Sequence, residues 1–129
     1  MRRLTETESK LVGPVRVLVC GGRNYSDHER VKAVLNALHE RVGISVIIQG
    51  GARGADELAF GWARANGVEE IQFDADWETH GSFAGPMRNT QMLYEGKPDL
   101  VIAFPGGRGT GDMVRKARKS GIDVVEIAP

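Results

Sequence analysis

Short runs of apolar residues alternate along the chain with longer stretches in which apolar positions recur every three or four residues. The runs predict five β-strands, at 15–20, 44–49, 69–73, 100–104 and 123–127. Three of these runs are almost entirely apolar, as is typical of strands with helices on both faces. Strands that alternate with helical patterns indicate βαβ units and a parallel sheet.

Helical spacing between the strands predicts four helices. The first has one apolar face, with Asp27 as its N-cap, formed by Val31, Val34, Leu35, Leu38 and Val42. The others lie around 58–63, over 86–95 with Pro98 ending the helix, and around 113–117 with Gly121 closing it. We therefore expect an α/β fold, a Rossmann-like three-layer sandwich with helices on both faces of a five-stranded, mostly parallel sheet in the order 3-2-1-4-5.

Residues 1–13 are polar and lack a hydrophobic period, so they predict a flexible N-terminal tail before a single domain over 14–129. The apolar runs are far shorter than the roughly twenty residues that cross a bilayer, and the first residues contain no apolar segment typical of a secretory signal. We therefore expect a cytoplasmic protein with no membrane partner. Cys20 is the lone cysteine and lies in an apolar run, which favours a buried side chain over a disulfide or a metal site.

The 17 basic and 17 acidic residues cancel, so no overall field attracts nucleic acid, and a nucleic-acid partner is not expected. The distribution of arginine is more informative. One arginine follows each of the first four predicted strands, namely Arg23, Arg53, Arg88 and Arg108. Because loops at the carboxyl ends of parallel strands open on one edge of the sheet, we expect these arginines around one pocket.

Glycine-rich segments accompany these arginines. Glycine lets the backbone approach a ligand closely, the helix that follows offers free N–H groups to an anion, and arginine matches phosphate oxygens. Trp77 could stack on a base or simply cap the sheet edge, and Asp56 and Asp112 could be no more than partners of helix dipoles. The candidate ligand-binding residues are Gly21, Gly22, Arg23, Gly50, Gly51, Arg53, Gly54, Asp56, Trp77, Arg88, Asn89, Gly106, Gly107, Arg108, Gly109 and Thr110.

Several familiar motifs are absent from the sequence. Neither glycine-rich loop ends in Gly-Lys-Ser/Thr, which excludes a P-loop ATPase, and Asp112 stands where a dinucleotide fingerprint needs its third glycine. The three histidines lack metal-ligand spacing: His39 is expected to be solvated on the polar side of the first helix, and His80 to lie near the site. We expect neither a metal nor a cofactor.

The set of motifs at 21–23, 50–56, 85–89 and 105–110 resembles the YspA-like branch of the SLOG superfamily, which contains the Smf/DprA and LOG proteins. The resemblance extends over nearly all of residues 15–129. It implies a Rossmann-like domain that recognises nucleotides or nucleotide-derived ligands, with some members acting as sensors in phage and antiphage conflict. It further implies a homodimer or higher homo-oligomer, and a ligand such as an ADP-ribose-like or cyclic-nucleotide signal.

LOG enzymes cleave the N-glycosidic bond of nucleoside monophosphates, and their motif reads Pro-Gly-Gly-x-Gly-Thr-x-x-Glu. Met113 occupies the glutamate position here and offers no carboxylate for proton transfer. Arg88 matches the arginine that LOG enzymes use near their substrate, so ligand binding without hydrolysis is the leading hypothesis. Two alternatives are a phosphoribohydrolase with Asp112 or Glu57 as its acid, and DprA-like binding of single-stranded DNA, which the zero net charge disfavours.

Overall fold

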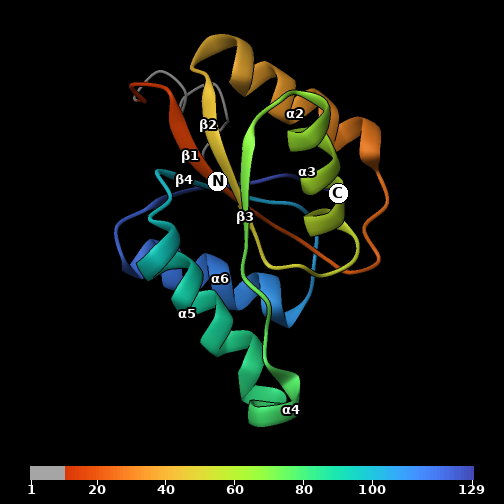
Figure 1. The fold of residues 1–129 in the computed structure, drawn as a ribbon, viewed down its shortest axis with the longest axis vertical. Helices are drawn as coiled ribbons and strands as arrows, with labels where there is room; N and C mark the ends of the chain where they lie inside the picture. Colours follow the sequence, from red (N-terminus) through yellow and green to blue (C-terminus); the bar gives the residue numbers. More distant parts are fainter. Residues whose placement is uncertain (1–10) are drawn as a thin grey trace.

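Five parallel strands form one sheet in the computed structural model, which describes residues 11–129 (Figure 1). The strands are β1 (Val15–Cys20), β2 (Ile44–Gln49), β3 (Glu69–Gln72), β4 (Leu100–Ala103) and β5 (Asp123–Glu126). Their order is β3-β2-β1-β4-β5, and each neighbouring pair is parallel. The predicted strands and their order are therefore confirmed, with the last three strands ending one residue earlier than expected.

The helices are α2 (His28–Arg41), α3 (Ala55–Ala65), α4 (Trp77–His80), a 3₁₀ turn η1 (Gly81–Phe83), α5 (Ala84–Gly96) and α6 (Arg108–Lys119). The sequence pattern does not predict α4 and η1. It also places the starts of α5 and α6 too late, because glycine and proline near both starts are poor helix formers. As a consequence Arg108, which was expected in a loop, is the first residue of α6, while Arg88 lies within α5, as the predicted helix over 86–95 implies.

Helix α2 begins and packs as its sequence predicts. The Asp27 side chain accepts a hydrogen bond from the Arg30 N–H at 3.0 Å. The buried face comprises Val31, Val34, Leu35 and Leu38. The expectation that His39 is merely solvated is wrong: the turn after α2 brings the Ile44 N–H within 2.9 Å of His39 Nδ1, and the ring packs edge-on against Trp62.

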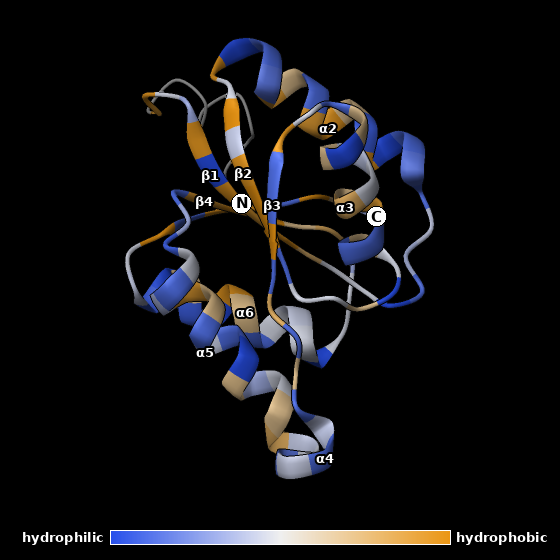
Figure 2. Ribbon diagram, viewed as in Figure 1, coloured by the Kyte–Doolittle hydropathy of each residue, from blue (hydrophilic) through white to orange (hydrophobic). Residues whose placement is uncertain are grey.

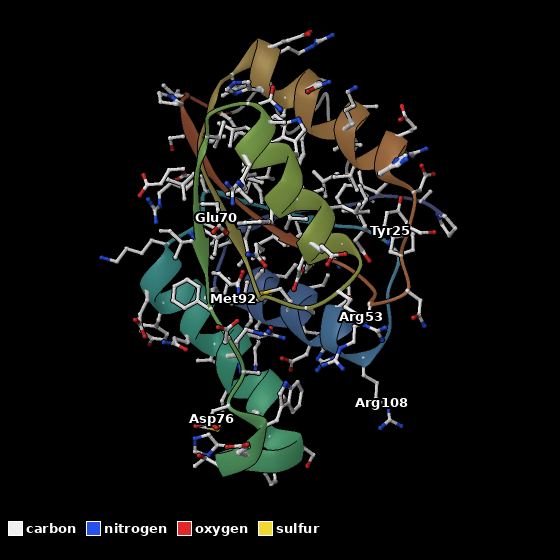
Figure 3. All side chains as sticks on the ribbon, turned by 45° about the vertical axis from the view of Figure 1, so that its right-hand side comes forward. Tyr25, Arg53, Glu70, Asp76, Met92 and Arg108 are labelled. Carbon is white, nitrogen blue, oxygen red and sulfur yellow. The ribbon has the colours of Figure 1, made fainter. Side chains whose placement is uncertain are left out.

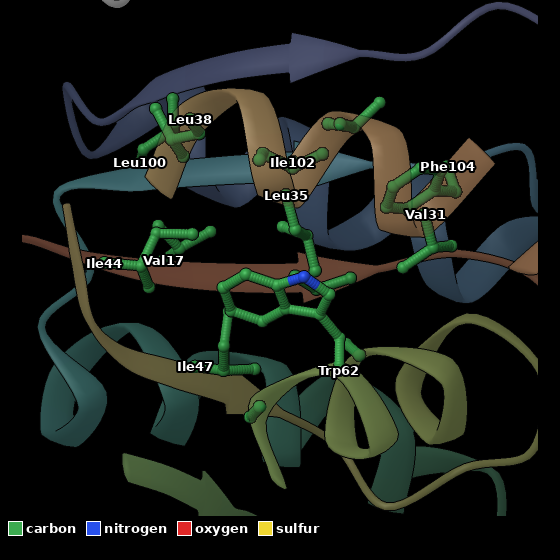
Figure 4. Packing of buried hydrophobic residues seen from close by; sticks show 14 of the residues in the cluster. Val17, Val31, Leu35, Leu38, Ile44, Ile47, Trp62, Leu100, Ile102 and Phe104 are labelled. Atoms are coloured by element: carbon green, nitrogen blue, oxygen red, sulfur yellow. The ribbon is translucent and has the colours of Figure 1, made fainter. Parts of the chain in front are cut away.

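Two separate hydrophobic cores cover the two faces of the sheet, which makes the fold a three-layer sandwich (Figures 1 and 2). Val17 and Val19 of β1 point into the core under α2 and α3, where Trp62 packs among aliphatic side chains (Figure 4). The alternate residues, Leu18 and Cys20, point into the core under α5 and α6. Cys20 is buried, as its position in an apolar run predicts.

The predicted tail, residues 1–13, lies mostly outside the described residues. Of its last three residues, Leu11 packs against the core under α2 and α3. In the part of the chain that the structure describes, no helix combines the length and the apolar character needed to cross a membrane. The same part of the chain contains no group of three metal-ligating side chains placed to share an ion.

Candidate ligand-binding site

A cavity of about 520 Å³ opens at the carboxyl ends of β1, β2 and β4, on the side of the sheet covered by α5 and α6. From β1 the sheet extends through β2 to β3 on one side and through β4 to β5 on the other. The cavity therefore lies at the switch point, where the strand order reverses and where α/β sheets bind ligands. Its volume falls within the range of about 300–1,000 Å³ usual for small-molecule sites. Of the candidate residues, it is lined by Gly21, Gly22, Arg23, Gly50, Asp56, Trp77, Arg88, Asn89, Gly107, Arg108, Gly109 and Thr110, together with Asp112.

Four candidate residues, Gly51, Arg53, Gly54 and Gly106, do not line the cavity. At Gly54, where φ is +78°, a Cβ would lie 2.1 Å from the carbonyl oxygen of Gly22. At Gly106, a Cβ would lie 2.7 Å from the Gly22 amide nitrogen. These two glycines therefore let neighbouring loops approach each other. Three of the four predicted arginines line the cavity, whereas Arg53 does not. Figure 3 shows that Arg53 nevertheless lies on the same side of the molecule as Arg108.

The loop after β2 uses its own backbone donors. Asp56 Oδ2 accepts hydrogen bonds from the N–H groups of Gly50 and Ala52, each at 3.2 Å. Gln49 Oε1 accepts from the Gly51 N–H at 2.6 Å. Asp56 is therefore more than a partner of the α3 dipole, because its carboxylate holds the loop in shape. The N–H groups of Gly50, Gly51 and Ala52 are therefore already bound within the protein and are not free to hold an anion.

The N-terminus of α6 keeps its donors free. Gly107 is the N-cap and provides no capping side chain, and the Gly111 N–H makes the first bond of the helix, to the Gly107 carbonyl at 3.0 Å. Within residues 11–129, nothing accepts from the preceding N–H groups of Arg108, Gly109 and Thr110. Such a helix start binds anions through its free donors and its dipole. All three residues line the cavity, which gives it a ready anion-binding end.

Arg88 of α5 connects the loop after β2 to this end of the cavity. Its Nη1 donates to the Gly50 carbonyl at 2.5 Å, and its Nε donates to Asn89 Oδ1 at 3.1 Å. The amide of Asn89 in turn donates to the Gly109 carbonyl and to Asp112 Oδ2, both at 3.1 Å. Gly50 makes this possible, because a Cβ there would lie 2.8 Å from the Arg88 Cζ. The arginine is thus held in place by the protein before any ligand arrives.

The aromatic residue Trp77 also lines the cavity. The guanidinium of Arg23 lies over this ring, 5.3 Å from its centroid, while 48% of Trp77 remains exposed. Gly85 lies close to the ring edge, where a Cβ would come within 3.2 Å. His80, which was expected near the site, does not line the cavity.

The sequence analysis did not assign other residues that line the cavity, among them Ala52, Ser82, Pro86 and Met92. Met92 lies within the helix predicted over 86–95 and also contributes to the core under α5 and α6. Ser82 lies in η1, a turn with no recognisable sequence pattern. Pro86 lies in the first turn of α5, and no pattern in the sequence indicates that it lines the cavity.

Two side chains of α6 lie at or beside the position of the LOG glutamate. Met113, at the glutamate position, is 1% exposed and packs in the core between α6 and the sheet. Asp112 lines the cavity, but its carboxylate is paired with Arg115 at 3.2 Å and with Lys116 at 2.9 Å. Glu57 is exposed and outside the cavity lining.

Burial shifts the ionisation of three groups that line the cavity. It raises the pKa of Asp56 to about 6, against the lowering effects of its backbone hydrogen bonds and of Arg88 and Arg23. Burial lowers the pKa of Arg88, an effect that Asp56 opposes, and it raises the pKa of the Cys20 thiol. Asp56 is therefore a buried carboxylate whose protonation changes near neutral pH, a property common at functional sites.

Comparison with known proteins gives one family match and one close relative. The model of the YAcAr family, described as the YspA, cpYpsA-related SLOG family, matches residues 15–80. The chain is also 41% identical over 122 residues to the Gene 61 protein of Mycobacterium phage D29, which covers 87% of this chain and 95% of that protein.

Two solved structures share the fold. DNA processing protein A (DprA) from Streptococcus pneumoniae matches with a TM-score of 0.71 and 22% identity over 88% of this chain and 50% of its own. Glycinamide ribonucleotide transformylase 1 from Symbiobacterium toebii matches with a TM-score of 0.54 and 20% identity, over 89% of this chain and 51% of its own. The chain thus spans about half of each, and at these identities the likeness shows the α/β fold alone.

Proposed function

Because the chain belongs to the YspA, cpYpsA-related SLOG family, we propose that it binds a phosphate-bearing, nucleotide-derived small molecule in this cavity. The observation that carries the proposal is the free N-terminus of α6, which lines the same cavity as Arg23, Arg88 and Arg108. A phosphate is the anion that such a combination of N–H donors and guanidinium groups recognises best.

The ring of Trp77, which also lines the cavity, suits stacking on a base of the nucleotide or of a second nucleoside. An ADP-ribose-like or cyclic-nucleotide signal has both parts. With such a ligand the protein would act as a cytoplasmic sensor or sequestering protein. A relative from a mycobacteriophage is in keeping with a role in phage–host conflict.

Isothermal titration calorimetry with ADP-ribose, cyclic AMP and AMP tests the proposal. At least one of them should bind, and Arg108→Ala should weaken its binding on the order of tenfold or more, the effect of losing a charged hydrogen bond. Arg53→Ala is the matched control, since Arg53 follows a neighbouring strand but lies outside the cavity. Equal losses in both variants, or no binding of any of the three compounds, would contradict the proposal.

The same protein samples test the two alternatives. A phosphoribohydrolase would release free base from AMP, and Asp112→Asn would abolish the release. We expect none above background, because the Asp112 carboxylate is bound by two cations. Fluorescence anisotropy with labelled single-stranded DNA tests the DNA-binding alternative, for which the chain offers no excess of positive charge.

We also propose that the protein forms a homodimer or higher homo-oligomer. Phe83, Met87 and Tyr94 are 72%, 49% and 79% exposed, and their spacing places them along one side of α5 and the turn before it. Light scattering coupled to size-exclusion chromatography measures the mass in solution. Combined Phe83→Ser and Tyr94→Ser substitutions should lower that mass if this side of α5 is the interface, and an unchanged mass would exclude it.

A further inference from the structure

One oxygen of the buried Asp56 carboxylate has no partner among the residues that the structure describes. Asp56 is 7% exposed and lines the cavity. Its Oδ2 accepts from the Gly50 and Ala52 N–H groups, but no donor within residues 11–129 reaches its Oδ1. An ionised carboxylate can only accept hydrogen bonds, and a buried acceptor without a donor costs free energy.

The surrounding protein groups do not supply this donor. The nearby Arg88 directs its Nη1 to the Gly50 carbonyl and its Nε to Asn89, so its charge favours the ionised carboxylate without a hydrogen bond to it. Arg23 lies over the ring of Trp77. The missing donor is therefore expected from a molecule in the cavity.

The chemistry of a nucleotide narrows the choice of donor. Its phosphate is an acceptor and carries the same charge as Asp56, so it belongs at the N-terminus of α6. The sugar, which follows the phosphate, offers neutral hydroxyl donors. We propose that Asp56 accepts a hydrogen bond from a ribose hydroxyl, so that the site selects ribonucleotides over deoxyribonucleotides. This inference rests on the proposed binding of a nucleotide-derived ligand, and it adds the sugar that the ligand contains.

Calorimetric titration of the unaltered protein at pH 8 with AMP, 2′-deoxy-AMP and 3′-deoxy-AMP tests the inference directly. Removing the hydroxyl that Asp56 binds should lower affinity on the order of 10- to 100-fold. If all three bind equally, the inference is wrong while nucleotide binding stands. If a base amino group is the donor instead, AMP will bind more tightly than IMP with no preference for ribose, which also overturns the inference. If none binds, both proposals fail for this ligand class.

A substitution of Asp56 then tests whether this residue accepts the hydrogen bond from the ribose hydroxyl. Asp56→Asn keeps an oxygen for the loop N–H groups but replaces the free acceptor by an amide donor, so the preference for ribose should fall to within a few-fold of unity. Asp74→Asn is the matched control, because Asp74 is a carboxylate beside the same loop that lies outside the cavity lining. Circular dichroism shows whether both variants fold. A preserved ribose preference in folded Asp56→Asn would overturn the assignment, and the titrations of the unaltered protein remain decisive if that variant does not fold.

Discussion

The glycines of α6 differ in what surrounds them. A Cβ at Gly109 would meet no other group within 4 Å, and Gly109 lines the cavity. A Cβ at Gly111 would meet only the Arg115 side chain at 3.8 Å, and Gly111 lies outside the cavity lining. Both residues are helical, so both positions accept alanine without a clash.

Gly109→Ala and Gly111→Ala should therefore separate binding from folding. Each should raise the free energy of unfolding by up to about 1 kcal/mol, the helix propensity gained over glycine. Only Gly109→Ala should weaken nucleotide binding, because its methyl group occupies the approach to the free N–H groups. Urea denaturation and calorimetry measure the two effects, and unchanged affinity in Gly109→Ala would show that the ligand does not reach this helix start.

Asp56 makes stability depend on pH in a defined direction. Its pKa in the folded protein, about 6, lies above the value of 3.8 expected when it is unfolded, so folding favours the protonated carboxyl. The contribution of the Asp56 carboxyl to the unfolding free energy is complete below pH 3.8 and is lost as the pH rises through 6. Between pH 3.8 and 6 the unfolding free energy of the unaltered protein should fall on the order of 3 kcal/mol because of this carboxyl, and Asp56→Asn should abolish that fall. Urea denaturation at pH 4 to 7 should therefore give a flatter profile for the variant.

Asp76 provides a control of opposite sign. Hydrogen bonds from the Thr79 side chain and backbone lower its pKa, so Asp76→Asn should remove stability that is present at neutral pH and lost in acid. If Asp56→Asn showed the same pH profile as the unaltered protein, the carboxylate would not be held in the buried position described.

The sequence predicts which residues come together at the site more accurately than it predicts what each of them does there. Arg23, Arg88 and Arg108 could be placed at one edge because parallel strands fix where their carboxyl ends lie. Gly50 and Gly51 look alike in sequence, yet only Gly50 lines the cavity. Roles of this kind depend on distances between loops, which no local pattern encodes.

At the scale of whole elements, strands and core faces follow from the sequence because apolar periodicity reports burial directly. The start of α6 does not, since its first residues include two glycines, which are poor helix formers. The end of α5 shows the same limit. Lys97 caps this helix with a φ of +50° and a ψ of +58°, a left-handed conformation that usually favours glycine.

Lys97→Gly should therefore stabilise the protein by about 1 kcal/mol, because glycine adopts this conformation without the steric cost of a Cβ. Lys119→Gly is the control, as Lys119 ends α6 in a helical conformation and its replacement should destabilise by a similar amount. Both are measured by urea denaturation at constant pH. A loss of stability in Lys97→Gly would mean that the lysine side chain contributes more than its backbone conformation costs.

Across the whole molecule, the cavity depends on segments that belong to opposite layers. The loop after β2 leads into α3, on one face of the sheet, whereas Arg88 belongs to α5 on the other face. The hydrogen bond from Arg88 to the Gly50 carbonyl connects the two layers beyond the edge of the sheet.

Positions 50 and 88 are consequently not free to vary independently. A Cβ on residue 50 would lie 2.5 Å from Arg88 Nη1, so Gly50→Ala should be costly alone and cheaper once Arg88→Ala has removed the guanidinium. A double-mutant cycle on unfolding free energies should give a coupling of about 1 kcal/mol or more. The equivalent cycle at Gly111 and Arg115, whose contact would be 3.8 Å, should be additive. Among homologues, a side chain larger than glycine at position 50 should therefore accompany the loss of arginine at position 88.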